Sequence, residues 1–126
     1  MAVFQTRWFS RWARKQGLSA KALCAAVAEI QQGLYETNLG GGLVKKRVAR
    51  PGQGKSGGFR TLIATNRGDR WVFVFGFPKN VRSNIDQTEE AALKLLSAKL
   101  LALSVRDLRT AVEAGELLEV TCDEKE

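Results

Sequence analysis

The residues best suited to chemistry are concentrated between positions 41 and 60, in the segment GGLVKKRVARPGQGKSGGFR. This segment holds six cations and no acidic residue: Lys45, Lys46, Arg47, Arg50, Lys55 and Arg60. Like charges crowded on a strand oppose folding by mutual repulsion, so such a cluster favours a site where an anion binds. The alternative is a solvated strand face whose lysines only blunt a sheet edge. The neighbouring glycines favour anion binding, because they allow a ligand to approach the backbone closely.

A second basic segment follows an apolar stretch. Lys79, Asn80 and Arg82 come directly after the strand expected at 71–77. Loops at strand ends often carry binding groups, although solubility alone explains a polar loop equally well. Combined with residues 41–60, this segment predicts that several strand ends converge on one phosphate group.

The charge of the whole chain favours a polyanionic partner. The 126 residues carry a net charge of +7, and residues 1–85 hold 15 Lys and Arg against 3 Asp and Glu. Nucleic acid is the commonest polyanion for such a domain. The alternative is a soluble protein whose charge only prevents aggregation. Residues 86–126 are acidic instead, and we interpret them as solvated helix surface. The alternative is that they rest against the basic face in the free protein.

Composition excludes several classes of function. The chain has no histidine and two cysteines, Cys24 and Cys122, so it predicts neither a zinc site nor a triad that relies on imidazole. No stretch approaches the ~20 apolar residues of a membrane span, and the N-terminus lacks the pattern of a signal peptide. Two cysteines make no disulfide framework, and we expect Cys24 to be a small core residue. We therefore expect a reduced, cytoplasmic protein with no cofactor and no membrane association.

The pattern of apolar residues predicts one domain over residues 1–126, with 121–126 as a frayed acidic tail. We expect an α+β fold, in which an N-terminal helical hairpin packs on a small antiparallel sheet and C-terminal helices follow. The expected elements are a strand at 3–5, helices from Thr6 to Gly17 and from Ser19, a loop at 35–42, strands at 43–49, 59–65 and 71–77, a flexible connection at 50–58, helices that begin at Asp86 and Ser104, and an edge strand at 117–120.

Side-chain periodicity assigns faces to these elements. In strand 43–49, Lys45 and Arg47 share one face, whereas Lys46 falls on the apolar side, so we expect it near an edge or reaching to solvent. In strand 71–77, aromatic residues alternate with valines, which predicts a central strand covered on both sides. The aromatic residues expected to share one face are Trp71, Phe73, Phe75 and Phe77, and the expected helix stripes are Leu23, Val27, Ile30 and Leu34, then Leu93, Leu96, Leu100 and Leu103.

Four segments in chain order form a recognisable pattern. These are the aromatic and basic opening at residues 4–13, GGLVKKRVA before a glycine-rich stretch, GKSGGFR leading into a strand, and FGFPKNVRSNI before the last helices. In these segments the chain resembles the RelE/ParE superfamily of toxins from type II toxin-antitoxin systems, and it is most similar to the RelE and HigB-like mRNA interferases. The resemblance covers nearly the whole chain. It implies a RelE-like fold and a toxin that cleaves mRNA, typically in the ribosomal A site.

The resemblance also implies roles for particular residues. It places Lys45, Arg47, Arg60 and Lys79 in the active site, with Lys55 and Arg82 as supports. We expect no metal ion, and we expect the following residues to bind RNA: Lys46, Arg50, Lys55, Asn80 and Arg82. Two positions depart from the family. Asn80 stands where some relatives have an arginine, and Asp86 where some have a tyrosine that stacks on a base. Phe75 or Phe77 would then supply the stacking.

The chemistry can be argued from the same residues. Without a metal ion, the ribose 2′-hydroxyl attacks the neighbouring phosphate, so the site needs a proton acceptor, charge to stabilise the phosphorane and a proton donor for the leaving 5′-oxygen. Without histidine, we expect Arg47 and Arg60 to clamp the phosphate, and Lys45 or Lys79 to transfer protons. Such a site would be weak on free RNA, which is consistent with a ribosome that orients the mRNA.

Two other functions remain open on the sequence alone. One is a non-catalytic inhibitor that binds a protein target, as ParE-like members of the superfamily bind gyrase. The other is a simple RNA-binding module whose aromatic residues at 71–77 stack on bases, although such spacing is more often found in a core. The resemblance also implies a cognate antitoxin, expected to be a helix-turn-helix protein with an acidic or amphipathic segment that covers the basic face.

Overall fold

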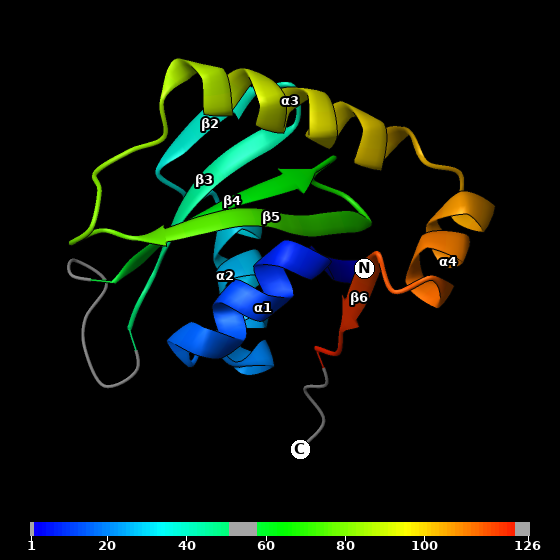
Figure 1. Ribbon diagram of the computed structural model, residues 1–126, viewed down its shortest axis with the longest axis horizontal. Coiled ribbons are helices and arrows are strands. Elements are labelled where there is room, and N and C mark those ends of the chain that lie inside the picture. Colours follow the sequence, from blue (N-terminus) through cyan, green and yellow to red (C-terminus); the bar gives the residue numbers. More distant parts are fainter. Residues whose placement is uncertain (1, 51–57, 123–126) are drawn as a thin grey trace.

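The fold is that of a computed structural model, which describes residues 2–50 and 58–122. Within these ranges the elements in chain order are β1 (Ala2–Thr6), α1 (Arg7–Gln16), α2 (Ala20–Gln31), β2 (Thr37–Gly40), β3 (Leu43–Val48), β4 (Phe59–Thr65), β5 (Arg70–Pro78), α3 (Gln87–Ala102), α4 (Val105–Glu113) and β6 (Leu117–Val120). Figure 1 shows α1 and α2 against one face of the sheet and α3 against the other. This arrangement confirms the predicted α+β fold. Most of the expected connection at 50–58, including Lys55, and most of the tail at 121–126 lie outside the described residues.

The described residues form one six-stranded sheet in the order β2-β3-β4-β5-β1-β6. β1 runs parallel to β5, with Ala2 opposite Arg70, and the other neighbouring strands are antiparallel. The prediction of an antiparallel sheet is therefore wrong at one pairing, and the sheet is mixed. Hairpin turns such as residues 66–70 show the direction of their strands in the sequence. β1 and β5 are joined by no such turn, so the sequence does not show their direction.

The segment 35–42, expected to be a loop, contains the edge strand β2. Asn38 pairs with Val44 of β3, and three glycines at positive φ turn the chain between the two strands. The residues Thr-Asn-Leu-Gly show little alternation of apolar and polar side chains, which is why periodicity does not reveal this strand. Its pairing with β3 becomes important for the site described below.

The N-terminal helices begin and end close to where the sequence predicts. The hydroxyl groups of Thr6 and Ser19 each accept a backbone hydrogen bond from the first turn of their helix (3.1 Å in both). Gly17 ends α1 with a φ of +76°. Leu34 is wrongly included in the predicted stripe, because α2 ends at Gln31 and Leu34 is 54% exposed beyond it.

β5 is central, as predicted, but a β-bulge changes which side chains share a face. Phe73 and Phe75 lie opposite adjacent residues of β4, so Val74 between them is an extra residue. As a result Phe75 and Phe77 pack on the α3 side of the sheet, whereas Phe73 packs with α1 and α2. The prediction that all the aromatic residues of this strand share one face is therefore wrong. The bulge also pairs Phe77 with Arg60 of β4.

The C-terminal helices confirm the predicted caps. Asp86 Oδ1 accepts a hydrogen bond from the N–H of Glu89 (2.8 Å), and Glu89 Oε1 accepts one from the N–H of Asp86 (2.9 Å), which together form a capping box. Ser104 caps α4, and Gly115 turns the chain into the edge strand β6. Among the leucines of the predicted α3 stripe, Leu100 alone is fully buried. No helix in the described ranges has the length and apolar character to cross a bilayer.

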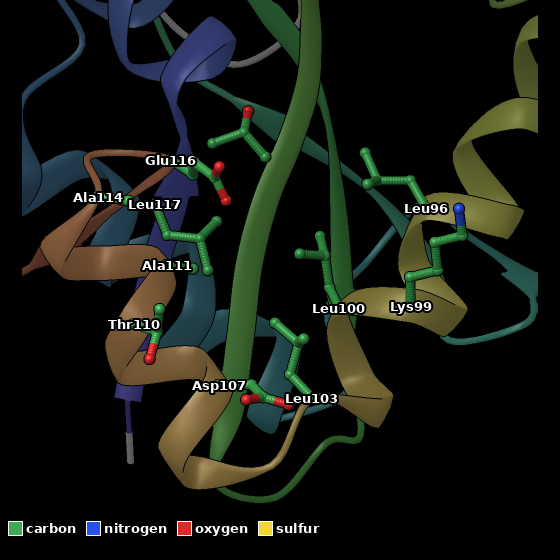
Figure 2. A pocket seen from close by; sticks show the side chains of 11 residues that line it. Leu96, Lys99, Leu100, Leu103, Asp107, Thr110, Ala111, Ala114, Glu116 and Leu117 are labelled. Atoms are coloured by element: carbon green, nitrogen blue, oxygen red, sulfur yellow. The ribbon is translucent and has the colours of Figure 1, made fainter.

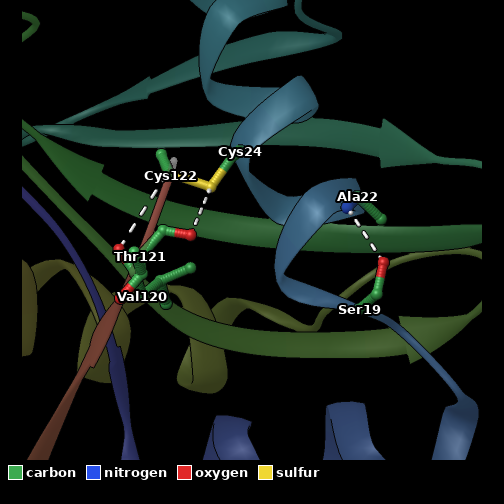
Figure 3. Close-up of a disulfide and its surroundings, with 6 residues drawn as sticks. All are labelled: Ser19, Ala22, Cys24, Val120, Thr121 and Cys122. Carbon is green, nitrogen blue, oxygen red and sulfur yellow. Dashed lines mark hydrogen bonds between the residues drawn. A yellow bond between two sulfur atoms is a disulfide. The ribbon is translucent and has the colours of Figure 1, made fainter. Parts of the chain in front are cut away.

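A disulfide joins Cys24 of α2 to Cys122, which follows β6 (Figure 3). The two Cα atoms lie 5.6 Å apart, although the residues are separated by 98 positions in the sequence. The expectation of two unpaired cysteines is therefore wrong. The two cysteines meet because β6 pairs with β1 at the sheet edge and contacts α2. No local sequence pattern reveals this arrangement. The cysteines therefore no longer support the expectation of a reducing environment.

Candidate functional site

Three of the predicted cations lie together on the α3 side of the sheet. Lys45 and Arg47 alternate along β3, and Arg60 of β4 is the cross-strand partner of Arg47. Directly opposed residues of neighbouring strands point to the same face, with Cβ atoms about 5 Å apart. Arg47 is exposed, whereas Lys45 is 8% and Arg60 3% exposed. These three residues, called the cation cluster below, therefore combine one open and two buried positive charges.

A carboxylate that the sequence prediction did not include bridges the two arginines. Glu36 Oε1 lies 2.8 Å from Nε of Arg60 and 3.8 Å from Nε of Arg47. The backbone N–H of Glu36 donates to the carbonyl oxygen of Lys45 (2.9 Å), so the pairing of β2 with β3 sets its position. Residues 41–60 contain no acid, but β2 brings one from outside that segment. The unrecognised strand is the reason that Glu36 was missed.

The guanidinium group of Arg60 is buried and has unused hydrogen-bond donors. Its side chain is 4% exposed, and within residues 2–50 and 58–122 neither Nε nor Nη1 has a hydrogen-bond acceptor. Nε is close enough to Glu36 for an ion pair, but its N–H bond is not aligned with the carboxylate oxygen. Buried donors without an acceptor are uncommon and unfavourable. An anion with several acceptor oxygens, such as a phosphate group, would satisfy them.

The turn between β5 and α3 lies beside the cation cluster. The N–H of Lys79 donates to the carbonyl oxygen of Gly58 (3.0 Å), which places the start of the turn next to β4. Further along, Asn84 Oδ1 accepts a hydrogen bond from Nζ of Lys45 (3.2 Å). Lys79 and Asn80 are exposed where the turn begins. The two basic segments of the sequence therefore meet at one end of the sheet.

Arg82 holds this turn in place. Its guanidinium group forms a bidentate ion pair with Glu89, donates from Nε to the carbonyl oxygen of Asn84 (3.0 Å) and lies 5.3 Å from the centre of the Phe77 ring. The hydrogen bond between the two side chains lowers the pKa of Glu89 and raises the pKa of Arg82. Arg82 thus fixes the turn against α3.

Two residues predicted to bind RNA lie on the opposite face of the sheet. Lys46 is 4% exposed, and its Nζ lies 2.6 Å from Glu29 Oε1 and 2.8 Å from the carbonyl oxygen of Leu34. The expectation that it reaches an edge or the solvent is wrong, because its charge is paired inside the protein. Arg50 lies over the ring of Phe59, 4.7 Å from its centre, on the side of α1 and α2. The structure does not bring either residue to the cation cluster.

A comparison with known families agrees with this fold. The model of the RelE toxin of the RelE/RelB toxin-antitoxin system matches residues 1–120. The chain belongs to the RelE toxin family. No curated protein and no solved structure gives a significant match. Membership makes the chain a toxin of a toxin-antitoxin system and implies a cognate antitoxin as its partner.

Asp86, one of the two positions expected to depart from the family pattern, has a structural role here, because it caps α3. Of the two residues expected to supply base stacking, Phe77 is 3% exposed beneath Arg82. Phe75 is partly buried against Trp8, with ring centres 4.8 Å apart and planes inclined by 21°. The exposed aromatic surface next to these residues belongs to Trp8, which is 47% exposed.

This RelE toxin also has a groove of about 510 Å³ between α3, α4 and the start of β6 (Figure 2). Its apolar side chains come from α3 and the residue after it (Leu96, Leu100 and Leu103), from α4 and the residue after it (Ala111 and Ala114) and from β6 (Leu117). The groove lies at the C-terminal end of α3 and contains none of the predicted site residues. The described ranges also contain no group of three or more His, Cys, Asp or Glu side chains that could hold a metal ion.

Proposed function

We propose that this RelE toxin is an endoribonuclease that cleaves mRNA in the cytoplasm, on the ribosome, with its own side chains. The observation that supports the proposal is the buried guanidinium group of Arg60, in which Nη1 has no acceptor in the described residues and Nε faces Glu36 in an ion pair without a hydrogen bond. Lys45 and Arg47 add two further positive charges on the same face. Planar guanidinium groups bind phosphate oxygens in pairs, so a phosphodiester fits both the charge and the geometry of this cluster.

The proposed reaction exchanges one P–O bond for another. The 2′-oxygen forms a bond to phosphorus while the bond between phosphorus and the 5′-oxygen breaks, which leaves a 2′,3′-cyclic phosphate and a 5′-hydroxyl end. Glu36 accepts the proton of the 2′-hydroxyl group, since it is the carboxylate in contact with the cluster. Arg47 and Arg60 stabilise the extra negative charge of the phosphorane. Lys45 or Lys79 donates a proton to the leaving 5′-oxygen.

Substrate binding would prepare Glu36 for this role. In the free protein, one oxygen of Glu36 lies between the guanidinium groups of Arg47 and Arg60. A bound phosphate competes for the same two groups, which loosens their hold on the carboxylate and leaves it available as a base. A cluster of this kind fixes the phosphate but not the ribose. Correct placement of the 2′-hydroxyl group would therefore depend on the ribosome, which supports the predicted weakness on free RNA.

The test combines growth, end mapping and a purified translation reaction. Arg60→Met and Glu36→Gln are compared with the wild type and with Arg109→Met, which removes an exposed arginine from α4. We expect the wild type and Arg109→Met to arrest growth and to leave 2′,3′-cyclic phosphate ends on mRNA. The two site variants should cleave at least ~100-fold more slowly, the usual loss for a proton acceptor or a charge-stabilising group.

Two results would contradict the proposal. A 2′-deoxynucleotide at the mapped cleavage position should block cleavage, so continued cleavage there would exclude attack by the 2′-oxygen. Growth arrest by the wild type with intact mRNA would instead indicate inhibition of a protein target, such as gyrase.

A further inference from the structure

Trp8 is an exposed aromatic residue that the proposed cleavage chemistry does not use. It lies in the first turn of α1 and is 47% exposed, whereas Trp71 is fully buried. Its indole stacks on Phe75 with ring centres 4.8 Å apart, and it lies nearly parallel to Trp12, at 6.1 Å and 9°. The two contacts fix the orientation of the indole. Nearly half of its surface remains open to a ligand.

Two aromatic residues of β5 connect Trp8 to the cation cluster. β1 pairs with β5 only as far as Gln5 opposite Phe73, so the rest of β5 extends past the end of β1. Beside that unpaired edge of β5, Trp8 packs on Phe75, whose ring centre lies 6.4 Å from that of Phe77. Phe77 is in turn the cross-strand partner of Arg60. A row of three aromatic rings therefore leads from Trp8 to the cation cluster.

The helix that carries Trp8 is basic. Helix α1 carries Arg7, Arg11, Arg14 and Lys15 and no acidic residue. Arg11 is exposed three residues after Trp8, on a neighbouring position of the helix surface. Open aromatic rings beside cations are typical of proteins that bind single-stranded nucleic acid, in which bases stack and phosphates pair. The core of a protein interface is instead depleted of charge.

We propose that Trp8, supported by Phe75, is a base-stacking subsite for a nucleotide near the phosphate bound by the cation cluster. This inference rests on the proposed endoribonuclease function and adds a residue that holds the substrate. Ring contacts of 4.8 and 6.4 Å lead from Trp8 to Phe77, the cross-strand partner of Arg60, so the stacked base belongs to a nucleotide close to the cleaved linkage. Since every base has an aromatic face, the subsite contributes affinity with little sequence preference.

The test measures binding of a short, dye-labelled RNA that carries 2′-O-methyl groups and cannot be cleaved. Fluorescence anisotropy compares the wild type with Trp8→Leu, Trp8→Phe and Leu95→Ala, a control that trims another exposed apolar side chain, which is 68% exposed on α3. We expect Trp8→Leu to bind about 5- to 100-fold more weakly. Trp8→Phe should stay within a few-fold of the wild type, and Leu95→Ala should match it.

A double-mutant cycle isolates the stacking itself. Abasic nucleotides are placed at each position of the RNA in turn, and one of them should weaken binding by the wild type but have no further effect on Trp8→Leu. Additive effects at every position would overturn the inference. If Trp8→Leu does not fold, quenching of the intrinsic fluorescence by RNA provides a second measurement. This quenching should be strong in the wild type and largely lost in Trp8→Phe, and equal quenching in both would overturn the inference.

The outcomes also separate this inference from the proposed function. If Arg60→Met abolishes RNA binding while the Trp8 variants bind like the wild type, the stacking subsite is wrong and the endoribonuclease proposal survives. If the wild type binds no RNA, the stacking subsite is wrong, and the cleavage assay in the translation reaction decides the endoribonuclease proposal separately. If the Trp8 variants bind RNA normally but are no longer neutralised by the antitoxin, the exposed indole belongs to a protein interface, which also overturns the inference.

Discussion

Replacing Glu36 by Gln tests whether the cation cluster is an anion site that Glu36 occupies in the free protein. The substitution keeps the shape of the side chain and removes its charge. At an effective dielectric constant of about 20, two unit charges 2.8 Å apart attract each other by about 6 kcal/mol, which desolvation largely offsets. Breaking a buried ion pair costs about 3–5 kcal/mol, whereas an exposed pair contributes less than about 1 kcal/mol.

The structure places this pair between those limits. The side chain of Arg60 is 4% exposed and that of Glu36 is 25% exposed, so we expect the free energy of unfolding to fall by about 2–3 kcal/mol in Glu36→Gln. Inorganic phosphate should restore much of the loss, because an anion that binds the folded state stabilises it. Urea denaturation followed by circular dichroism, in chloride and in phosphate at equal ionic strength, measures both effects.

The matched control is Glu113→Gln, which neutralises an exposed carboxylate on α4. It corrects for the general stabilisation that phosphate gives to any folded protein. A Glu36→Gln variant as stable as the wild type, or one that gains no more from phosphate than Glu113→Gln, would refute the electrostatic reasoning. Cleavage by Glu36→Gln should stay low even where phosphate restores its stability, since the proton acceptor is still missing.

Three further predictions concern the framework around the site. Cys24→Ser should lose up to about 4–5 kcal/mol in urea denaturation, because the disulfide closes a loop of 98 residues, and reductant should bring the wild type to the same midpoint. Gly76→Ala should lose about 1–3 kcal/mol and alter the near-ultraviolet circular dichroism, since an added Cβ would lie 2.4 Å from the ring of Trp12. The pKa of Glu89 is lowered by its hydrogen bond to Arg82, so its contribution to stability is complete above the ordinary value of 4.5 and is lost as the pH falls through the lowered value. Acid titration of the unfolding free energy should therefore be shallower for Glu89→Gln than for the wild type, and equal slopes would contradict this.

The features that the sequence predicts correctly are local ones. The caps at Thr6 and Ser19 and the capping box at Asp86 each depend on residues within one helical turn. The same holds for the alternation of Lys45 and Arg47, which places both on one face of β3. Patterns of this range are complete within a few residues, so they can be recognised without knowledge of the fold.

The features that the sequence misses depend on contacts between distant segments. The parallel pairing of β1 with β5 and the disulfide between Cys24 and Cys122 leave no local pattern. Glu36 was missed for a similar reason, since it reaches the cation cluster through the pairing of β2 with β3. The faces predicted for the aromatic residues of β5 are wrong for a different reason. The bulge at Val74 adds one residue, which reverses the face of every later side chain in the strand.

The position of Arg60 explains why the proposed site would bind a phosphate group firmly and yet depend on the ribosome for cleavage. Its strand lies between β3 and β5 in the sheet, so backbone pairing on both sides fixes its Cα atom, and burial beside Glu36 restricts the guanidinium group before any ligand binds. Donors fixed in this way need no reorganisation when charge develops on a phosphate. A flat sheet face, however, gives no comparable control over the ribose, and Trp8 at the far end of the aromatic row can hold only a base. In this proposal the toxin fixes the phosphate and one base, and the ribosome orients the 2′-hydroxyl group between them for attack.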